Sequence, residues 1–215
     1  MPAKDFSLTH VVYDDELLSQ KILALVTLTP IFIIVAYVAL LYSRRQIHTL
    51  FMLIGQLVNE GLNNILKQYI KEPRPHGCKH SGYGMPSSHA QFMGYFGGFC
   101  ILWSLVLGSN VDFISDKKTG NAFIILLSLL VTYSRVELGY HTETQVIVGG
   151  ILGVCFAAIW SLFISTIVDP HIRNIEELWI AKFFYFRDSK WMQHNLFLFE
   201  YESAIQDKTG RKKKS

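Results

Sequence analysis

The chain has 215 residues, of which 50% are hydrophobic and only 17% are charged, and its formal net charge is +3. A soluble domain usually carries about a quarter of its residues as charges, so this composition argues against a cytosolic globule and against a disordered chain. The basic residues are too dispersed for a nucleic-acid-binding surface, and three scattered cysteines cannot form a disulfide framework or a zinc finger. A multispan membrane protein is the class that remains.

Five apolar segments are long enough to cross a bilayer, because about 20 helical residues span a hydrocarbon core of about 30 Å. In the first, Pro30 is expected to kink the helix without ending the span. The second carries amides and Glu60 among its apolar residues, and the fourth is apolar until Arg135 and Glu137. These patterns predict an all-α fold, a bundle of transmembrane helices over residues 22–43, 47–66, 90–108, 121–138 and 146–168.

Residues 1–168 are predicted to form the transmembrane domain and residues 169–215 a separate segment. Residues 174–187 mix aromatic and charged side chains, which is typical of a helix at the membrane interface; a soluble cap is the alternative. The chain ends in a basic tail in which Lys212 and Lys213 have the spacing of the dilysine retrieval signal of endoplasmic-reticulum membrane proteins. A basic tail near anionic lipids is the alternative interpretation.

The distribution of basic residues predicts the orientation of the spans. Arg44 and Arg45, Lys117 and Lys118, and nine Lys/Arg residues after the last span share one side, which the positive-inside rule assigns to the cytosol. The opposite, lumenal face then holds residues 67–89 and 139–145. Lys67 and Arg74 lie on this face against the rule, and the simplest reason is that they hold an anion.

Three clusters of polar residues converge on the predicted lumenal face. In the first, the ammonium of Lys67 and the planar guanidinium of Arg74 suit phosphate oxygens, although such residues at a helix end also reach for lipid headgroups. In the second, a helix that begins near Ser87 would present unpaired amides to an anion, with His89 in its first turn; a solvated loop is the alternative.

The third cluster returns Arg135 and His141 to the same face. Two histidines allow one ring to attack phosphorus and the other to protonate the leaving oxygen. No cofactor and no metal is expected, because Mg²⁺ prefers carboxylates and this face offers three glutamates beside three or four cations.

The patterns Lys-x6-Arg-Pro, Pro-Ser-x-His and Ser-Arg-x5-His resemble the three-part signature of the type 2 phosphatidic acid phosphatase superfamily. The chain is more closely similar to the dolichyldiphosphatase branch, in segments such as 72–75 and 83–89 and over most residues up to about 150. The resemblance implies that His141 is the nucleophile, that His89 is the general acid, and that the phosphoryl oxygens are bound by Lys67, Arg74, Ser87, Ser88 and Arg135.

The chain departs from the superfamily pattern at two positions. Ser88 replaces a glycine, and Gln145 replaces the aspartate that would hold the nucleophilic ring. Gln145 follows His141 by four residues, so its amide oxygen can still orient the imidazole, but it supplies no charge. Glu143 is expected to face away into solvent.

The resemblance implies hydrolysis of dolichyl diphosphate, a polyprenyl lipid, to dolichyl phosphate and phosphate through a phosphohistidine. It places the enzyme in the endoplasmic-reticulum membrane. A phosphatase for another lipid phosphate and a non-catalytic lipid-phosphate binder are the alternatives. The sequence does not predict the oligomeric state.

A polar stripe runs along the second span toward this site. Gln56, Glu60, Asn63 and Lys67 follow a 4, 3, 4 spacing, which places them on one helix face. Glu60 is expected either to orient Lys67 or to join neighbouring helices through polar contacts.

Overall fold

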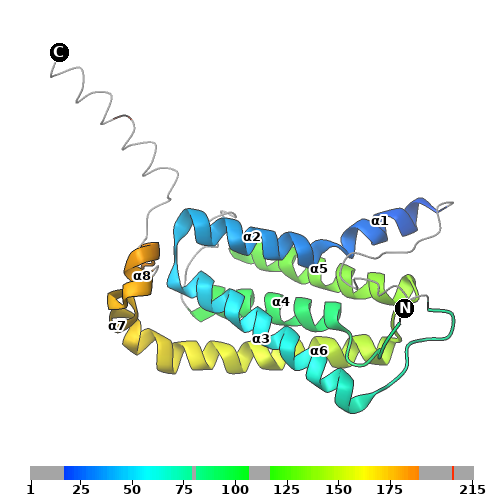
Figure 1. The fold of residues 1–215 in the computed structure, drawn as a ribbon. Coiled ribbons are helices and arrows are strands. Elements are labelled where there is room, and N and C mark those ends of the chain that lie inside the picture. Colours follow the sequence, from blue (N-terminus) through cyan, green and yellow to red (C-terminus); the bar gives the residue numbers. More distant parts are fainter. Residues whose placement is uncertain (1–16, 79–80, 107–116, 189–204, 206–215) are drawn as a thin grey trace, which may run out of the picture.

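The structure is a computed structural model, and it describes residues 17–78, 81–106, 117–188 and 205 (Figure 1). The predicted all-α class is confirmed: within these ranges the regular structure is helical, and the isolated β-bridge between Gln46 and Arg187 is the exception. The elements are α1 (Leu18–Val26), α2 (Thr29–Arg44), α3 (Ile47–Ile70), α4 (Ser88–Val106), α5 (Lys117–Glu137), α6 (Glu143–Phe163), a π-helical turn (Ile164–Val168), a 3₁₀ turn (Asp169–His171), α7 (Ile172–Glu177) and α8 (Trp179–Phe184).

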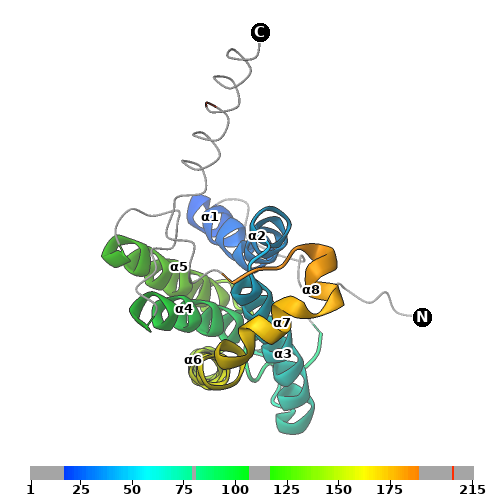
Figure 2. The same ribbon diagram turned by 90° about the vertical axis from the view of Figure 1, so that its left-hand side faces the viewer.

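Helix α4 lies inside the bundle, where it contacts α2, α3, α5 and α6 (Figure 2). Its closest neighbour is α6, because glycines let the two backbones approach each other. A Cβ atom on Gly149 would lie 2.6 Å from the carbonyl oxygen of Ser87. Ser87 and the start of α4, which carries His89, therefore pack against the first turns of α6.

Three helical stretches among the described residues are long and apolar enough to cross a membrane, namely 18–44, 118–137 and 143–177. Helices α3 and α4 are also long, but they carry several amide side chains. Of those amides, Asn59, Asn63 and Gln91 lie inside the bundle and are fully buried, whereas Asn64 and Gln68 are exposed. The crossing of the membrane by α3 and α4, and with it the count of five spans, stays a prediction.

The first span bends where Pro30 was expected to kink it. Helices α1 and α2 are separated by Thr27 and Leu28, because a proline at position 30 has no N–H to donate to the carbonyl of Val26. The hydroxyl of Thr29 donates to that carbonyl instead, at 2.6 Å. The bend therefore leaves the Val26 carbonyl satisfied, and it places Thr27 at a turn inside the bundle.

Two element boundaries differ from the sequence prediction in ways that affect the site. Helix α3 continues to Ile70, so Lys67 lies in its last turn rather than in a loop. Helix α6 begins at Glu143, three residues earlier than the predicted span, because Thr142 caps it. His141 therefore precedes the helix and is not part of it.

The predicted interfacial helix over residues 174–187 is instead two short helices, α7 and α8, with Leu178 extended between them. A single helix of 14 residues would extend about 21 Å in one direction. The two-helix arrangement instead returns the chain to the turn between α2 and α3, where Arg187 exchanges backbone hydrogen bonds with Arg45 and Ile47. Residues 206–215, including the dilysine pair, and residues 199–201 lie outside the described residues.

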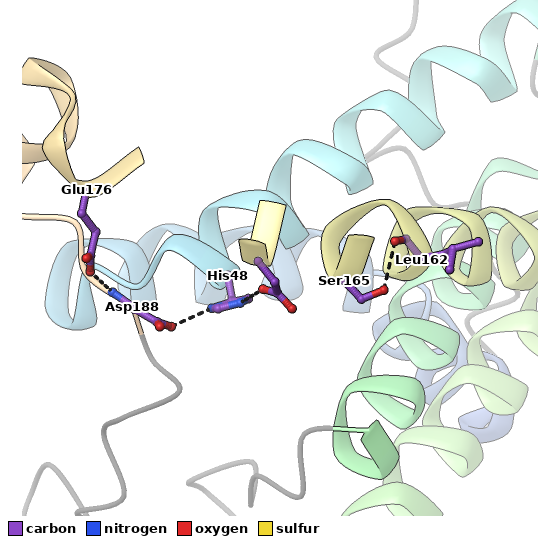
Figure 3. A network of polar contacts seen from close by, with 6 residues as sticks. His48, Leu162, Ser165, Glu176 and Asp188 are labelled. Carbon is purple, nitrogen blue, oxygen red and sulfur yellow. Dashed lines mark hydrogen bonds and ion pairs between the residues drawn. The ribbon is translucent and has the colours of Figure 1, made fainter. Parts of the chain in front are cut away.

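The buried side chain of His48 connects this returning segment to the bundle (Figure 3). The Nε2 atom of His48 lies 2.8 Å from a carboxylate oxygen of Asp169, and its Nδ1 atom lies 3.8 Å from Asp188. The His48 ring also packs on Trp103, with 4.6 Å between ring centroids. Glu176 in turn accepts a hydrogen bond from the backbone N–H of Asp188.

Candidate active site

The three sequence clusters meet at the end of the bundle opposite α7 and α8 (Figure 1). The first occupies the end of α3 and the start of the following connection. The second immediately precedes and begins α4, and the third spans the turn between α5 and α6. The expected convergence of these clusters is therefore seen in the structure.

His141 is held in the turn before α6 by its backbone and by Arg74. The N–H groups of Tyr140 and His141 both donate to the carbonyl of Arg135, at 3.1 Å. The Nη1 atom of Arg74 lies 3.1 Å from the carbonyl oxygen of Tyr140 and 3.2 Å from Nε2 of His141. The arginine of the first cluster thus touches the ring of the residue that the resemblance implies is the nucleophile.

Arg135 is positioned by a residue that sequence reasoning missed. Its Nη1 atom donates to the hydroxyl of Thr27 at 3.0 Å, and its guanidinium stacks on the ring of Tyr140 at 4.0 Å. The Ser134 hydroxyl, which donates to the Val131 carbonyl at 2.6 Å, lies 3.3 Å from the same Thr27 oxygen, and the His89 ring hydrogen-bonds to the Thr27 backbone. Thr27 therefore links the first span to the second and third clusters, which contain the two predicted catalytic histidines. Its signal in the sequence was a hydroxyl within an apolar run shortly before a proline.

Gln145 closes a capping box at the start of α6. The Thr142 hydroxyl accepts from the Gln145 N–H, and Gln145 Oε1 accepts from the Thr142 N–H. The same oxygen lies 3.2 Å from Nδ1 of His141. The expected contact between Gln145 and the ring is present, although it is made across a helix cap and not along a helix face. Glu143 is exposed, as expected.

The hydrogen-bond network assigns the tautomer of His141. Gln145 Nε2 faces two acceptors, a Glu72 carboxylate oxygen and the Pro73 carbonyl oxygen, each at 2.8 Å, so the amide cannot be turned around. Its Oε1 must then accept from His141, which places the ring proton on Nδ1. The lone pair on Nε2 consequently points toward Arg74, in the state that a nucleophile requires.

Three buried donors at this end make no hydrogen bond with the rest of the described chain: Ser87 Oγ, Arg74 Nε and Arg135 Nε. Buried donors of this kind are rare unless a ligand uses them. Together with the half-buried Lys67 they suit an oxyanion such as phosphate. One expectation needs correction: the backbone N–H of Ser87 is already used, because it donates to the carbonyl of Gln145 at 3.0 Å. Ser88 is half-buried in the first turn of α4.

The electrostatic environment keeps His141 neutral. Burial, and then the charges of Arg74 and Arg135, hold the pKa of His141 far below its ordinary value, and Lys67 acts in the same direction. The hydrogen bond that His141 donates to Gln145 opposes this lowering of the pKa only in part. A neutral ring is the form that can attack phosphorus.

Amide side chains on α3 connect this site to α4. Asn59 and Gln91 exchange hydrogen bonds, and Asn63 Nδ2 contacts both Gln91 Oε1 at 2.8 Å and the Pro86 carbonyl oxygen at 3.3 Å. Of the predicted stripe, Asn63 therefore joins neighbouring helices; Asn59 and Gln91 lie outside the stripe. Because Pro86 precedes Ser87, the network also holds the second cluster in place. Among the described residues, no group of three or more His, Cys, Asp or Glu side chains could hold a metal ion.

Comparisons with known proteins identify the family to which this chain belongs. The model of the PAP2 superfamily matches residues 47–169. Dolichyldiphosphatase 1 of Homo sapiens is 36% identical over 97% of this chain and 91% of its own length. Dolichyldiphosphatase of Saccharomyces cerevisiae is 33% identical over 86% of this chain and 80% of its own length.

One solved structure shares the fold. It is the crystal structure of a transmembrane PAP2 type phosphatidylglycerolphosphate phosphatase from Bacillus subtilis. The TM-score is 0.60 at 23% identity, and the match covers 69% of this chain and 78% of the other. At this identity the likeness supports the helical arrangement alone.

Proposed function

Because this chain belongs to the PAP2 superfamily, and within it to the dolichyldiphosphatases, we propose that it hydrolyses dolichyl diphosphate to dolichyl phosphate and phosphate. The protein is a multi-pass membrane hydrolase, and the reaction would return the carrier lipid for protein N-glycosylation. The observation that carries the proposal is the position of His141. Its Nε2 atom, which bears the lone pair, lies 3.2 Å from Nη1 of Arg74, a candidate phosphate-binding residue.

In the first half of the reaction, His141 Nε2 attacks the terminal phosphorus. A nitrogen–phosphorus bond forms, and the bond to the bridging oxygen breaks, so that dolichyl phosphate leaves. His89 donates a proton to that oxygen. Arg74, Arg135, Lys67 and the hydroxyl of Ser87 meet the charge on the equatorial phosphoryl oxygens, where electrostatic stabilisation of the transition state is largest.

In the second half, a water molecule attacks the phosphohistidine. His89, now neutral, accepts a proton from this water, and His141 leaves with its electron pair restored on Nε2. Fixed cations already surround the phosphoryl group, so the charge that a metal would neutralise is met by side chains. We accordingly propose turnover in the presence of a chelator.

The proposed location is the endoplasmic-reticulum membrane, with the active site lumenal and the C-terminus cytosolic. The distribution of basic residues and the names of the relatives support it. Glycan acceptor sites inserted at residues 79–80 and in the carboxyl-terminal tail test the orientation. Modification at the loop alone is expected, and modification at the tail alone would contradict the assignment.

Phosphate release from a panel of lipids in detergent tests the reaction itself. The panel contains dolichyl diphosphate, a short isoprenoid diphosphate, phosphatidic acid and a sphingoid phosphate, each with the native protein and the His141→Ala variant in EDTA. The highest kcat/KM is expected on dolichyl diphosphate, with loss of turnover in the variant. A higher value on phosphatidic acid, or no turnover on any member, would refute the proposal.

A further inference from the structure

The nucleophile of this site has no carboxylate directly on its Nδ1 atom. The neutral amide of Gln145 occupies that position, at 3.2 Å. Attachment of a phosphoryl group to Nε2 makes the imidazole cationic while it remains close to Arg74, Arg135 and Lys67. The three cations bind the phosphoryl oxygens but oppose the positive charge on the ring, and a neutral amide alone compensates little of that repulsion.

A carboxylate does reach the ring through the amide. Glu72 accepts a hydrogen bond from Gln145 Nε2 at 2.8 Å, and Gln145 Oε1 in turn accepts from His141 Nδ1. A charge-assisted hydrogen bond at one end of an amide polarises it and strengthens the bond at its other end. The three side chains therefore form a continuous chain from a negative charge to the nucleophile.

The surroundings keep this chain in one arrangement. The backbone carbonyl of Glu72 accepts from the N–H of Gly84 at 2.7 Å. Gly84 also lies against the amide of Gln145, where a Cβ atom would come within 2.5 Å of Oε1. With Pro73 holding the second N–H of the amide, Gln145 can neither turn over nor move away from the ring.

We propose that Glu72 is a positioning residue for the nucleophile and acts through Gln145 as a relay. It fixes the proton of His141 on Nδ1, and it stabilises the positive charge of the ring when Nε2 carries the phosphoryl group. The inference rests on the proposed function, because it assigns a role in that reaction. Glu72 touches no reacting atom and is not itself a catalytic residue.

A purely structural role for Glu72 makes a different prediction. If Glu72 only anchored the connection between α3 and α4, its charge would not matter as long as an oxygen remained to accept from Gln145. Glu72→Gln keeps that oxygen and removes the charge. In the relay, this variant should lower kcat and the rate of phosphoenzyme formation about tenfold, with KM within twofold and the melting temperature unchanged.

Exchange of the two groups gives the sharper test. Gln145→Glu alone puts two carboxylates in contact and should lower kcat at least as much as Glu72→Gln. The double variant Glu72→Gln/Gln145→Glu puts one carboxylate directly on His141 Nδ1 and an amide donor behind it. We expect the double variant to recover at least half, on a logarithmic scale, of the loss of kcat seen in Gln145→Glu. Full recovery is not expected, because the Pro73 carbonyl loses the N–H donor of Gln145.

The control is Glu143→Gln, which removes the same charge from the exposed start of α6. Its kcat should stay within twofold of the native value. The relay is overturned if Glu72→Gln keeps kcat within twofold, or if the two single losses simply multiply in the double variant. If Gln145→Glu does not fold, the kcat and KM of Glu72→Gln still distinguish the relay from a purely structural role of Glu72.

The comparison also separates the relay from the proposed function. The variants are measured on whichever lipid phosphate the native protein hydrolyses fastest. If that lipid is not dolichyl diphosphate, the proposed substrate is wrong, while the relay stands or falls on the ratio of variant to native kcat. A native protein that hydrolyses no lipid of the panel would overturn both.

Discussion

Two buried histidines lie at opposite ends of the bundle, and the charges around them are of opposite sign. His48 is 3% exposed and lies between the carboxylates of Asp169 and Asp188. His141 is 2% exposed and lies beside Arg74, with an amide on its other nitrogen. The first ring lies between carboxylates of the same chain, while the second lies among cations whose natural counterion is a substrate.

The comparison teaches how to separate a structural from a reactive histidine in this fold. Burial and a polar side chain near each ring nitrogen do not distinguish the two. The distinguishing features are the sign of the nearby charge and the buried donors left without partners, which the structure shows at Ser87, Arg74 and Arg135. Each of the following predictions tests that contrast.

The largest effect is expected for His141→Ala, which removes the nucleophile. Loss of a nucleophile that acts together with its supporting groups lowers kcat on the order of 10⁴-fold or more. Phosphate release from dolichyl diphosphate measures this loss. His48→Ala, measured below its melting temperature, is the matched control. Equal losses of kcat in the two variants would contradict the assignment of a reactive role to His141 and a structural role to His48.

Replacement of Arg135 by glutamine should lower kcat/KM by roughly 10²–10³-fold, the cost of one charge-stabilising donor. The charge of Arg135 also lowers the pKa of His141, so its removal raises that pKa toward the ordinary value. Protonation of His141 then prevents its attack up to a higher pH. The acidic limb of the pH profile of kcat/KM should therefore move to higher pH. Arg173→Gln, an exposed change at the opposite end, should leave the limb in place; a downward shift in Arg135→Gln would contradict this account.

His89→Ala should distinguish diphosphate from monoester substrates. A general acid is worth about 10²–10⁴-fold when the leaving oxygen needs a proton. Dolichyl phosphate is a phosphate with a second pKa of about 6, so it leaves readily without protonation, whereas an alcohol does not. The loss of kcat is therefore expected to be at least tenfold smaller on dolichyl diphosphate than on phosphatidic acid, and equal losses would exclude His89 as the acid.

Thr27→Val tests the link between the first span and the site. The change preserves shape but removes the hydroxyl that accepts from Arg135 and contacts the Ser134 hydroxyl. An unsatisfied charged donor costs about 1.5 kcal/mol or more. We expect kcat/KM to fall about tenfold, and Thr27→Ser to retain the native value. A Thr27→Val variant with native kinetics would show that Arg135 is held without Thr27.

The smallest effect on turnover is expected for His48→Ala, which acts on stability. Removing one partner of a buried polar contact to a carboxylate costs about 3 kcal/mol. Asp169 and Asp188, which are only 15% and 10% exposed, would each lose their contact with His48. The melting temperature in detergent should fall while kcat at 20 °C stays within about threefold; an unchanged melting temperature would show that His48 does not hold the returning segment.

Much of the site was predictable because its signals are local. The spacings of Lys67, Arg74, His89, Arg135 and His141 placed these residues at span ends, and helix geometry then brought them to one face. The short pattern Thr142-x-x-Gln145 is also a readable capping box, and it explains why α6 begins before the predicted span.

The parts that were not predictable depend on contacts between distant segments. Thr27 belongs to no motif, and its role follows only from how the bend before Pro30 packs against α5. The contact between Glu72 and Gln145 joins residues 73 positions apart. Likewise, the two short helices α7 and α8 follow from the return of the chain to the turn between α2 and α3, and no periodicity in residues 174–187 encodes that return.

The most direct test of the central claim is to trap the phosphorylated enzyme. Native protein is mixed with dolichyl diphosphate labelled in the terminal phosphate, quenched within milliseconds at alkaline pH, and digested for mass spectrometry. We predict an acid-labile phosphoryl group on His141, absent from His141→Ala and accumulating in single turnover before phosphate is released. Label on another residue, or native turnover of dolichyl diphosphate with His141 never phosphorylated, would contradict this account.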